Sequence, residues 1–293
     1  MSSRKQFIFA VVVFGTLGPF IRQINLPPTE LALYRAILAA GFLSFYLIIK
    51  QTAFDFKQIK KEMVLLFFSG AAMALNWIFL FKAFNHTTVS LATLSYYFAP
   101  VIVILVSTLI FKEAITTKKV ICFIASTMGL ILMTDIGESS GSQLKGILFG
   151  LTAAFFYSIV ILFNKFIKNV PAIQKTLLQF IAAIVVLLPY VLITTGINIT
   201  SINGSGLISL LIVGLFHTGF TYVLFFGSVK ELSGHEVSLL SYIDPLVAVI
   251  VSIIVLNESI LPIQLLGGAM IIGFTLINET EKKEKTKNNN MSA

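Results

Sequence analysis

The chain has 293 residues, of which 57% are hydrophobic and only 12% are charged, and its mean hydropathy is +0.93. A soluble domain of this size does not carry so large an apolar excess, so the composition excludes a soluble protein and predicts one embedded in a lipid bilayer. The formal net charge of +8 would suit a nucleic-acid-binding protein only if the basic residues were gathered on one exposed surface.

Ten apolar segments of helical length follow one another along the chain. Each offers close to the roughly 20 apolar residues that a helix needs to cross a hydrocarbon core of about 30 Å. Because unpaired backbone groups are too costly in lipid, we expect each segment to be helical, which makes the fold an all-α integral membrane protein with ten transmembrane helices. The predicted spans are 6–24, 28–49, 63–84, 88–111, 118–134, 146–166, 175–195, 207–229, 235–256 and 261–277.

The ten spans divide five and five, and a short loop rich in glycine and serine separates them. We expect one five-helix repeat in residues 1–137 and a second in 144–278. Residues 279–293 contain four lysines and a run of asparagines, a composition typical of a disordered basic tail.

The basic residues indicate how the chain is oriented in the membrane. With the N-terminus inside and ten crossings, all but four of the 21 Lys and Arg residues fall on the cytoplasmic side. The exceptions are Arg22, Arg35, Lys82 and Lys145. The positive-inside rule predicts this bias, so we expect a multi-pass protein of the cell inner (cytoplasmic) membrane with both termini cytoplasmic. The positive charge then gives no support to nucleic-acid binding.

The second half of the chain repeats part of the first. Residues 83–113 align with 228–258 at a fixed offset of 145, and this alignment pairs Tyr97 with Tyr242, Pro100 with Pro245, Ser107 with Ser252 and Glu113 with Glu258. Proline and glutamate are rare within or beside spans, so their joint recurrence in the corresponding span indicates a true repeat. Since each half has an odd number of crossings, the two repeats are predicted to be inverted, as in many secondary transporters.

Three segments carry a resemblance to a known family. They are LNWIFLFKAFNHTTVSLATLSYYFAPVIVILVSTLIFKE (75–113), GHEVSLLSYIDPLVAVIVSIIVLNE (234–258) and LALYRA (31–36). The chain resembles the drug/metabolite transporter superfamily, EamA type, over essentially its whole length. The resemblance implies ten helices in two inverted EamA-like repeats, with the third, fourth, eighth and ninth among those that line a central cavity. It also implies export or exchange of small metabolites, often amino acids or related compounds.

Charged and titratable residues inside spans are the first functional candidates, because they are costly in lipid without partners. Asp244 is predicted to carry a proton or hold a substrate amine, or else to pair with Arg35 or cap backbone groups freed by Pro245. Arg35 is a candidate for attracting a carboxylate substrate, although snorkelling to the membrane surface or pairing with Asp244 or Glu30 is the favoured structural alternative. His217 is a candidate proton switch, although a lone helical histidine more often serves packing.

Aromatic and amide side chains of the predicted central spans are candidates for lining a substrate cavity, with interhelical packing as the alternative for each one alone. These candidates are Asn76, Trp77, Tyr96, Tyr97, Tyr157, Tyr222 and Tyr242. Pro100 and Pro245 are predicted hinges, because proline removes a backbone donor and bends a spanning helix. Glu113 and Glu258 close the fourth and ninth spans, where each either forms a gate or assists the N-terminus of the next helix.

The sequence contains no nucleotide-binding glycine loop, zinc-type cluster or Ser/His/Asp arrangement, so we expect no enzyme, no catalytic residue, no metal and no cofactor. We expect a secondary active or facilitative transporter that exports or exchanges small metabolites by alternating access. Its expected partners are a small-molecule substrate and the lipid bilayer, with a homodimer possible. The alternative is a non-transporting multi-helix membrane sensor or scaffold, which the short loops disfavour.

Overall fold

The computed structural model describes residues 2–110, 117–133, 140–229, 231–232, 240–274 and 277, and each regular element in these ranges is helical. Six helical segments are long and apolar enough to cross a membrane, and four shorter apolar helices accompany them. The predicted all-helical membrane fold is therefore confirmed. The count of ten crossings and the inverted orientation of the halves stay predictions.

In its described residues, the first part of the chain contains seven helices. They are α1 (Ser3–Gly15), α2 (Leu17–Gln23), α3 (Pro28–Ile49), α4 (Phe56–His86), α5 (Val89–Tyr96), α6 (Ala99–Ile110) and α7 (Thr117–Met133). The second part contains α8 (Ser140–Phe166), α9 (Ala172–Thr194), η1 (Ile199–Ser201), α10 (Gly204–Leu211), η2 (Ile212–Phe220), α11 (Thr221–Val229), α13 (Ile243–Leu256) and a last apolar helix, Pro262–Phe274.

Several predicted spans are interrupted where the sequence indicated one continuous helix. The fourth breaks at Tyr97, so that Pro100 lies in the first turn of α6, where its missing N–H costs nothing. The ninth has the same arrangement, because α13 begins directly after Tyr242 and Pro245 lies in its first turn. The first span is interrupted at Thr16, between α1 and α2. Both predicted hinge prolines thus follow a break in the helix, and their movement stays a prediction.

The eighth span contains a π-helix, η2, between α10 and α11. Two threonine hydroxyls donate to carbonyls five residues earlier: Thr218 Oγ1 of η2 to Val213 O, and Thr221 Oγ1, from the first residue of α11, to Phe216 O, both at 2.7 Å. A π-helix is rare and is often found at functional sites, because the wider turn re-aims the side chains around it.

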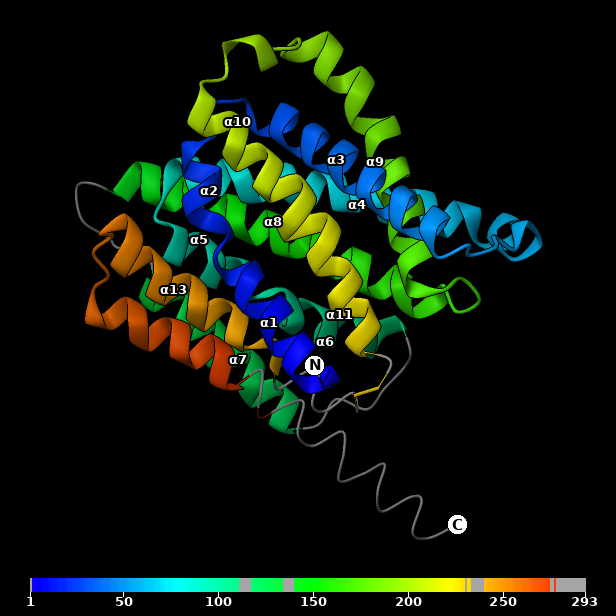
Figure 1. Cartoon of the computed structure of the whole chain (residues 1–293). Helices are drawn as coiled ribbons and strands as arrows, with labels where there is room; N and C mark the ends of the chain where they lie inside the picture. The colour runs from blue at the N-terminus through cyan, green and yellow to red at the C-terminus, as the bar shows by residue number, and fades with distance from the viewer. Residues whose placement is uncertain are drawn as a thin grey trace, which may run out of the picture.

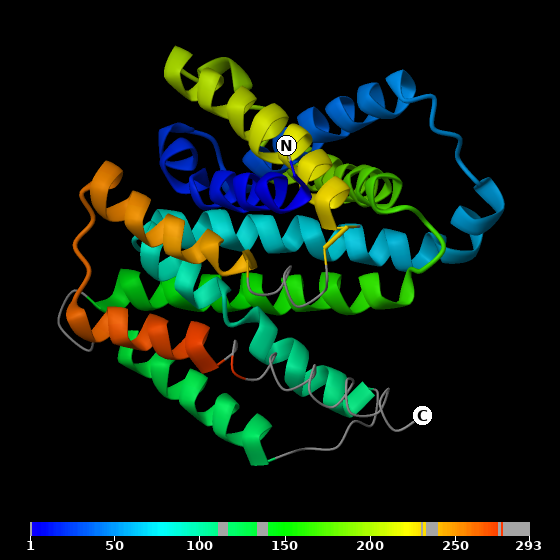
Figure 2. The ribbon, with the colours of Figure 1, turned by 60° about the horizontal axis from the view of Figure 1, so that its bottom comes forward.

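The helices pack into one bundle in which segments distant in sequence lie side by side. Figure 1 shows α1 between α13 and α11, and Figure 2 shows α4 running along α8. Helix α3 packs on α9 and η2. The interior between these helices is formed from both halves of the chain, and the site described below lies there.

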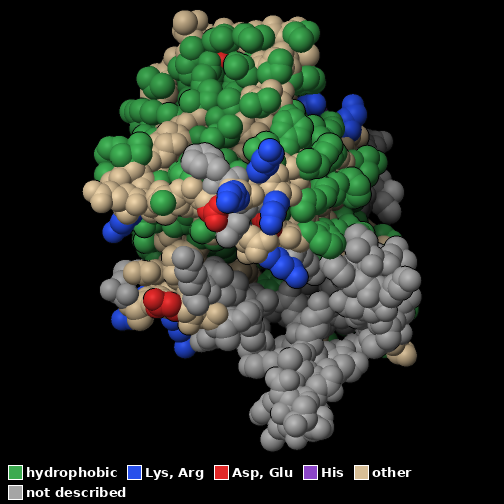
Figure 3. All heavy atoms as spheres, turned by 90° about the vertical axis from the view of Figure 1, so that its right-hand side faces the viewer, with side chains coloured by type: hydrophobic (Ala, Val, Ile, Leu, Met, Phe, Trp, Pro, Cys, Tyr) green, Lys and Arg blue, Asp and Glu red, His purple; other side chains and the backbone are tan. Residues whose placement is uncertain are grey.

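The outer surface is apolar. Helix α9 exposes Ile181, Val185, Leu188 and Leu192, which lie on one face because they are three or four residues apart. Figure 3 shows hydrophobic side chains over much of the described surface in that view, with Lys and Arg gathered in a narrower zone. Exposed apolar area of this extent suits contact with lipid.

Small residues allow close approach at several helix crossings. A Cβ on Gly70 of α4 would lie 2.4 Å from the backbone oxygen of Gln179 and 2.6 Å from Cβ of Ala182, both on α9. A Cβ on Gly214 of η2 would lie 2.5 Å from Cβ of Leu38 on α3. These contacts bring α9 close to α4 and α3 close to η2.

Substitution of Gly70 by alanine should therefore destabilise the bundle, because a backbone oxygen cannot move aside. We expect a loss of about 1–3 kcal/mol, typical of overpacking, measured as a lower unfolding temperature of the purified protein in detergent. Gly41→Ala is the matched control, since Gly41 is also within a helix and has nothing within 4 Å of the added Cβ. This control should be neutral or stabilising by up to about 1 kcal/mol. Equal behaviour of the two variants would contradict the packing account.

Candidate functional site

A cavity of about 540 Å³ is lined by residues of α1, α2, α3, α4, α5, α6, α8, α9, η2, α11 and α13. It receives eleven of the twelve residues selected from the sequence as cavity, charge or hinge candidates, and these are Arg35, Asn76, Trp77, Tyr96, Tyr97, Pro100, Tyr157, His217, Tyr222, Tyr242 and Asp244. The twelfth, Pro245, is buried in α13 and does not line the cavity. One cavity thus collects residues from helices that are far apart in the chain.

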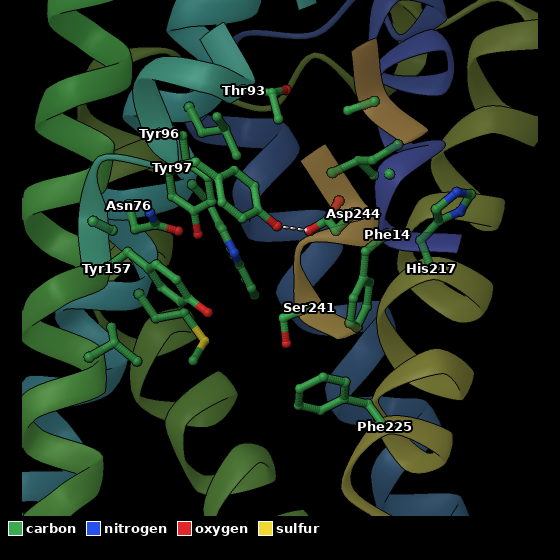
Figure 4. A pocket seen from close by; sticks show the side chains of 18 of the residues that line it. Phe14, Asn76, Thr93, Tyr96, Tyr97, Tyr157, His217, Phe225, Ser241 and Asp244 are labelled. Atoms are coloured by element: carbon green, nitrogen blue, oxygen red, sulfur yellow. Dashed lines mark hydrogen bonds between the residues drawn. The ribbon is translucent and has the colours of Figure 1, made fainter. Parts of the chain in front are cut away.

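Asp244 is bound across the interface between the two halves. The hydroxyl of Tyr97, at the break after α5, donates a hydrogen bond to its Oδ2. Figure 4 shows this bond and places Asp244, Phe14 and Ser241 opposite Tyr96 and Tyr157. Among the described residues, the ion pair with Arg35 that was one alternative for Asp244 is not formed. A tyrosine hydroxyl therefore holds the carboxylate.

Arg35, on α3, is almost fully buried, with a relative exposure of 5%. Its Nε donates a hydrogen bond to Thr218 Oγ1 at 2.8 Å, and its guanidinium carbon lies 4.5 Å from the centroid of the Trp77 ring. The hydroxyl of Thr218 donates its own hydrogen to Val213 O, so its oxygen is an acceptor for Arg35. The π-helical turn and the indole face together fix the orientation of the guanidinium.

His217 lies at the edge of the cavity, where it joins α1 to η2. Its Nε2 is 3.0 Å from Thr16 Oγ1, at the break between α1 and α2, and its Nδ1 is 3.4 Å from Ile212 O. The ring also packs against Phe20, with centroids 5.0 Å apart. These contacts suit the packing interpretation of His217, and a proton-carrying role stays a prediction.

Aromatic rings form much of the cavity wall. Tyr96 packs on Tyr157 with centroids 5.2 Å apart, and Tyr222 packs on Phe14 at 5.3 Å. Trp77 packs on Phe180 at 5.4 Å. The predicted aromatic cluster therefore forms, and its surface suits an organic molecule with an apolar body or a cationic group.

The cavity also has an amide cluster that the sequence analysis missed. Gln179 on α9 donates from Nε2 to Ser69 Oγ at 2.7 Å and to Asn164 Oδ1 at 2.9 Å, and it is only 2% exposed. Gln179 and Asn164 line the cavity. Uncharged amides in apolar segments are the signal that would have revealed them, because they too need partners in a membrane.

A contact between Arg22 and Glu258, which we name the Arg22–Glu258 contact, lies next to Val89 of the cavity lining, and we expect it to close that end of the cavity. Arg22 Nη2 lies 3.0 Å from Glu258 Oε1 and also donates to Thr87 O at 2.7 Å. The Glu258 carboxylate accepts the backbone N–H of Val89 at 2.9 and 3.0 Å and that of Ser90 at 3.4 Å. Glu258 follows α13, and Val89 begins α5.

This geometry corrects one interpretation of Glu258. The sequence suggested a gate or a cap for the next helix along the chain, whereas the carboxylate caps α5, in the other half. A carboxylate at a helix N-terminus is favourable for the same dipole reason in either position. Close by, the buried side-chain hydroxyls of Ser90 and Ser252 are hydrogen-bonded to one another. Glu113, the predicted counterpart, lies outside the described residues.

Glu258→Gln should open this end of the cavity to solvent. In a Cys122→Ser background, which removes the single native cysteine, Thr93→Cys would report from the cavity wall one turn into α5. We expect labelling by a membrane-impermeant thiol reagent, applied from the Arg22 side, to accelerate about tenfold, the scale of losing a charge-assisted hydrogen bond.

Glu62→Gln supplies the matched control. Glu62 is likewise a buried carboxylate that accepts backbone amides, those of Lys168 and Asn169 at 3.2 Å, but it lies away from the cavity lining. The Glu62→Gln variant should leave the rate of Thr93→Cys labelling unchanged. If Glu258→Gln behaves as the control does, the Arg22–Glu258 contact does not close the cavity.

Comparison with known proteins agrees with this architecture. The model of the EamA-like transporter family matches residues 6–135 and again 144–279. The uncharacterized transporter YxxF of Bacillus subtilis is 30% identical over 287 residues, covering 96% of this chain and 91% of the relative. An uncharacterized transporter of Archaeoglobus fulgidus is 26% identical and covers 92% of this chain.

A solved crystal structure shares the fold with a TM-score of 0.63 at 16% identity, covering 94% of this chain and 96% of its own. That likeness concerns the fold alone. The two matches to the family model and the relatives that span nearly the whole chain are independent evidence, because they rest on sequence. The chain belongs to the EamA-like transporter family.

Proposed function

We propose that this protein moves small metabolites across the cytoplasmic membrane by alternating access, exporting or exchanging amino acids or related compounds. The observation that carries the proposal is a cavity that contains a half-buried carboxylate and a buried guanidinium and is lined from both halves of a transporter-family chain. Charged groups inside a membrane-spanning bundle are costly, and those that occur are usually paired with one another or lie on a transport pathway. The described cavity gives them such a role.

Ten crossings in two inverted repeats belong to the proposal. The helix contacts support it. When each helix of one half is replaced by the helix at the same position in the other half, a pair of helices in contact becomes another pair in contact. Thus α4 packs on α8 as α11 packs on α1, and α5 packs on α8 as α13 packs on α1. Two related halves would produce this pattern.

Two local details support the same relationship. The helix breaks at Tyr97 and Tyr242 differ by the 145 positions of the sequence repeat. In addition, Gly70 against Ala182 and Gly214 against Leu38 are equivalent contacts at a separation of 144 positions. Equivalent interfaces let one half rock against the other, with the interrupted helices at Pro100 and Pro245 as the points of bending.

The direction of opening follows from the predicted topology. With the N-terminus inside, Arg22 and Glu258 both lie at the outer face, so the Arg22–Glu258 contact would close the outer end. The described conformation then corresponds to a state in which the cavity is sealed toward the outside. Transport requires a second state in which this contact is broken.

Flux through proteoliposomes tests the proposed function. Vesicles that contain the purified protein and are preloaded with a broad panel of amino acids and related metabolites should release at least one compound faster than protein-free vesicles. External addition of the same compound should accelerate its release if the protein exchanges substrates. Absence of protein-dependent flux for the whole panel, with either a proton or a sodium gradient, would contradict the proposal.

Proton coupling is a separate part of the proposal and depends on Asp244, with His217 as the second candidate. Asp244 accepts a bond from Tyr97, and Tyr96, Tyr157 and Tyr222 line the same cavity. If Asp244 carries the proton, Asp244→Asn should remove the pH dependence of flux, because the amide cannot titrate. His217→Gln tests the alternative carrier. If both variants keep the original pH dependence, transport is uncoupled from protons at these residues.

A further inference from the structure

Arg35 has an unsatisfied donor group in the wall of the cavity. Its Nη1 is buried and has no hydrogen-bond partner among the described residues, although Nε is bonded to Thr218. A guanidinium keeps its positive charge in proteins, and a buried charge without a counter-ion is strongly unfavourable. The fold therefore keeps a costly cation at a fixed place and orientation in the cavity wall.

The acidic residues that the sequence offered as partners are bound elsewhere. Glu30, fully buried on α3, accepts the backbone N–H and the side-chain amide of Asn198 at 2.7 and 3.0 Å. Asp244 accepts the hydroxyl of Tyr97. In the described part of the chain, the one ion pair between side chains joins Arg22 to Glu258. No carboxylate of the described residues is therefore in direct contact with Arg35, and a bound molecule could supply its counter-charge.

Gln179, the residue of the second half that corresponds to Arg35, is uncharged, so packing alone does not require a charge at this place in the bundle. The Gly70 and Gly214 contacts relate α9 to α3 by 144 positions, and this separation makes Gln179 the counterpart of Arg35. Gln179 also lines the cavity and is satisfied by neutral partners, Ser69 and Asn164. The same place in the bundle is therefore filled by a neutral amide in one half and by a cation in the other.

From the free guanidinium edge, its fixed orientation and its neutral counterpart, we propose that the transported molecule carries a carboxylate, which binds Arg35 beside the Trp77 ring. This inference rests on the proposed transport function and names the substrate class: small organic acids and zwitterions with an apolar body. The planar fork of arginine matches a carboxylate in two parallel hydrogen bonds. A molecule whose charged group is an amine alone is not expected to bind at Arg35, because its positive charge would repel the guanidinium.

Trp77 makes the binding step directly observable. It is the single tryptophan of the chain, and the Arg35 guanidinium lies over its ring. A carboxylate that joins Arg35 changes the electrostatic environment of the indole, so its fluorescence reports occupancy of this site. Three probes share one phenyl body that suits the aromatic wall and differ in charge: 3-phenylpropionate, phenylalanine and 2-phenylethylamine.

In the purified full-length protein, we expect 3-phenylpropionate and phenylalanine to change Trp77 emission saturably, and 2-phenylethylamine to leave it unchanged at the same concentrations. This comparison uses the wild-type protein and decides the question even if a variant fails to fold. Binding of the amine without the acids would overturn the assignment. An equal emission change with sodium chloride would also overturn it, because the site would then hold an inorganic ion.

Arg35→Gln places in α3 the residue that the chain itself uses at the corresponding position of α9. It should weaken binding of 3-phenylpropionate about tenfold or more, the usual effect of losing a charge-assisted hydrogen bond. Arg35→Lys, which keeps the charge but loses the fork, should be intermediate. Lys82→Gln is the control, because Lys82 also lies over aromatic rings, 5.6 Å from Phe79, yet outside the cavity lining. It should bind as the wild type does.

Parallel flux measurements separate the two proposals. If Arg35→Gln binds 3-phenylpropionate as tightly as the wild type while metabolite flux persists, the carboxylate assignment is wrong and transport stands. If binding depends on Arg35 but no metabolite moves, the anion site stands and the transport proposal is wrong.

Discussion

Polar groups inside an apolar bundle must be satisfied within the protein, and this constraint accounts for the placement of nearly every charge described here. Glu30 meets it with both amides of Asn198, and Glu62 meets it through Oε1, which accepts amides of Lys168 and Asn169, while its Oε2 has no described partner. Glu258 meets it with the N-terminus of α5 and with Arg22. Each of these carboxylates joins elements that are far apart in the sequence. Arg35 alone among these groups retains a buried donor with no described partner.

The cavity exists because close packing at some helix crossings is combined with interrupted helices at others. Outside the cavity lining, Gly70 lies close to a backbone oxygen of α9 and Gly214 lies close to the Leu38 side chain of α3. The breaks at Tyr97 and Tyr242 and the π-helix η2 then turn side chains inward that a regular helix would place elsewhere. Irregular backbone at membrane depth is tolerated where it lines such an interior. The same interruptions that shape the site also supply the points at which it can change shape.

The sequence predicted the members of the site better than their partners. Asp244 and Arg35 were found because charge within apolar segments is rare, and both line the cavity. The pairing of one with the other was a wrong alternative, since Tyr97 and Thr218 hold them. Those partners depend on which helices cross at what depth, which one sequence does not specify. The π-helix was missed because apolar periodicity does not distinguish it from an α-helix over nine residues.

The capping of α5 by Glu258 shows the same limit. A carboxylate at the end of a span indicates an interfacial acid, but the helix N-terminus it meets is chosen by tertiary packing. The repeat, in contrast, was visible in the sequence, because proline and glutamate recur at fixed spacing. Gln179 could have been found by extending that comparison to Arg35, although the first two helices of each half are too diverged for sequence similarity to point there.

Alternating access requires the two halves to separate beside the Arg22–Glu258 contact, where the side chains of Ser90 on α5 and Ser252 on α13 are hydrogen-bonded. The most direct measurement is substrate flux through a Ser90→Cys/Ser252→Cys variant in a Cys122→Ser background. Complete oxidation to the disulfide should stop flux, and reduction should restore it. Undiminished flux through the fully cross-linked protein would show that this interface does not open, and would contradict the account.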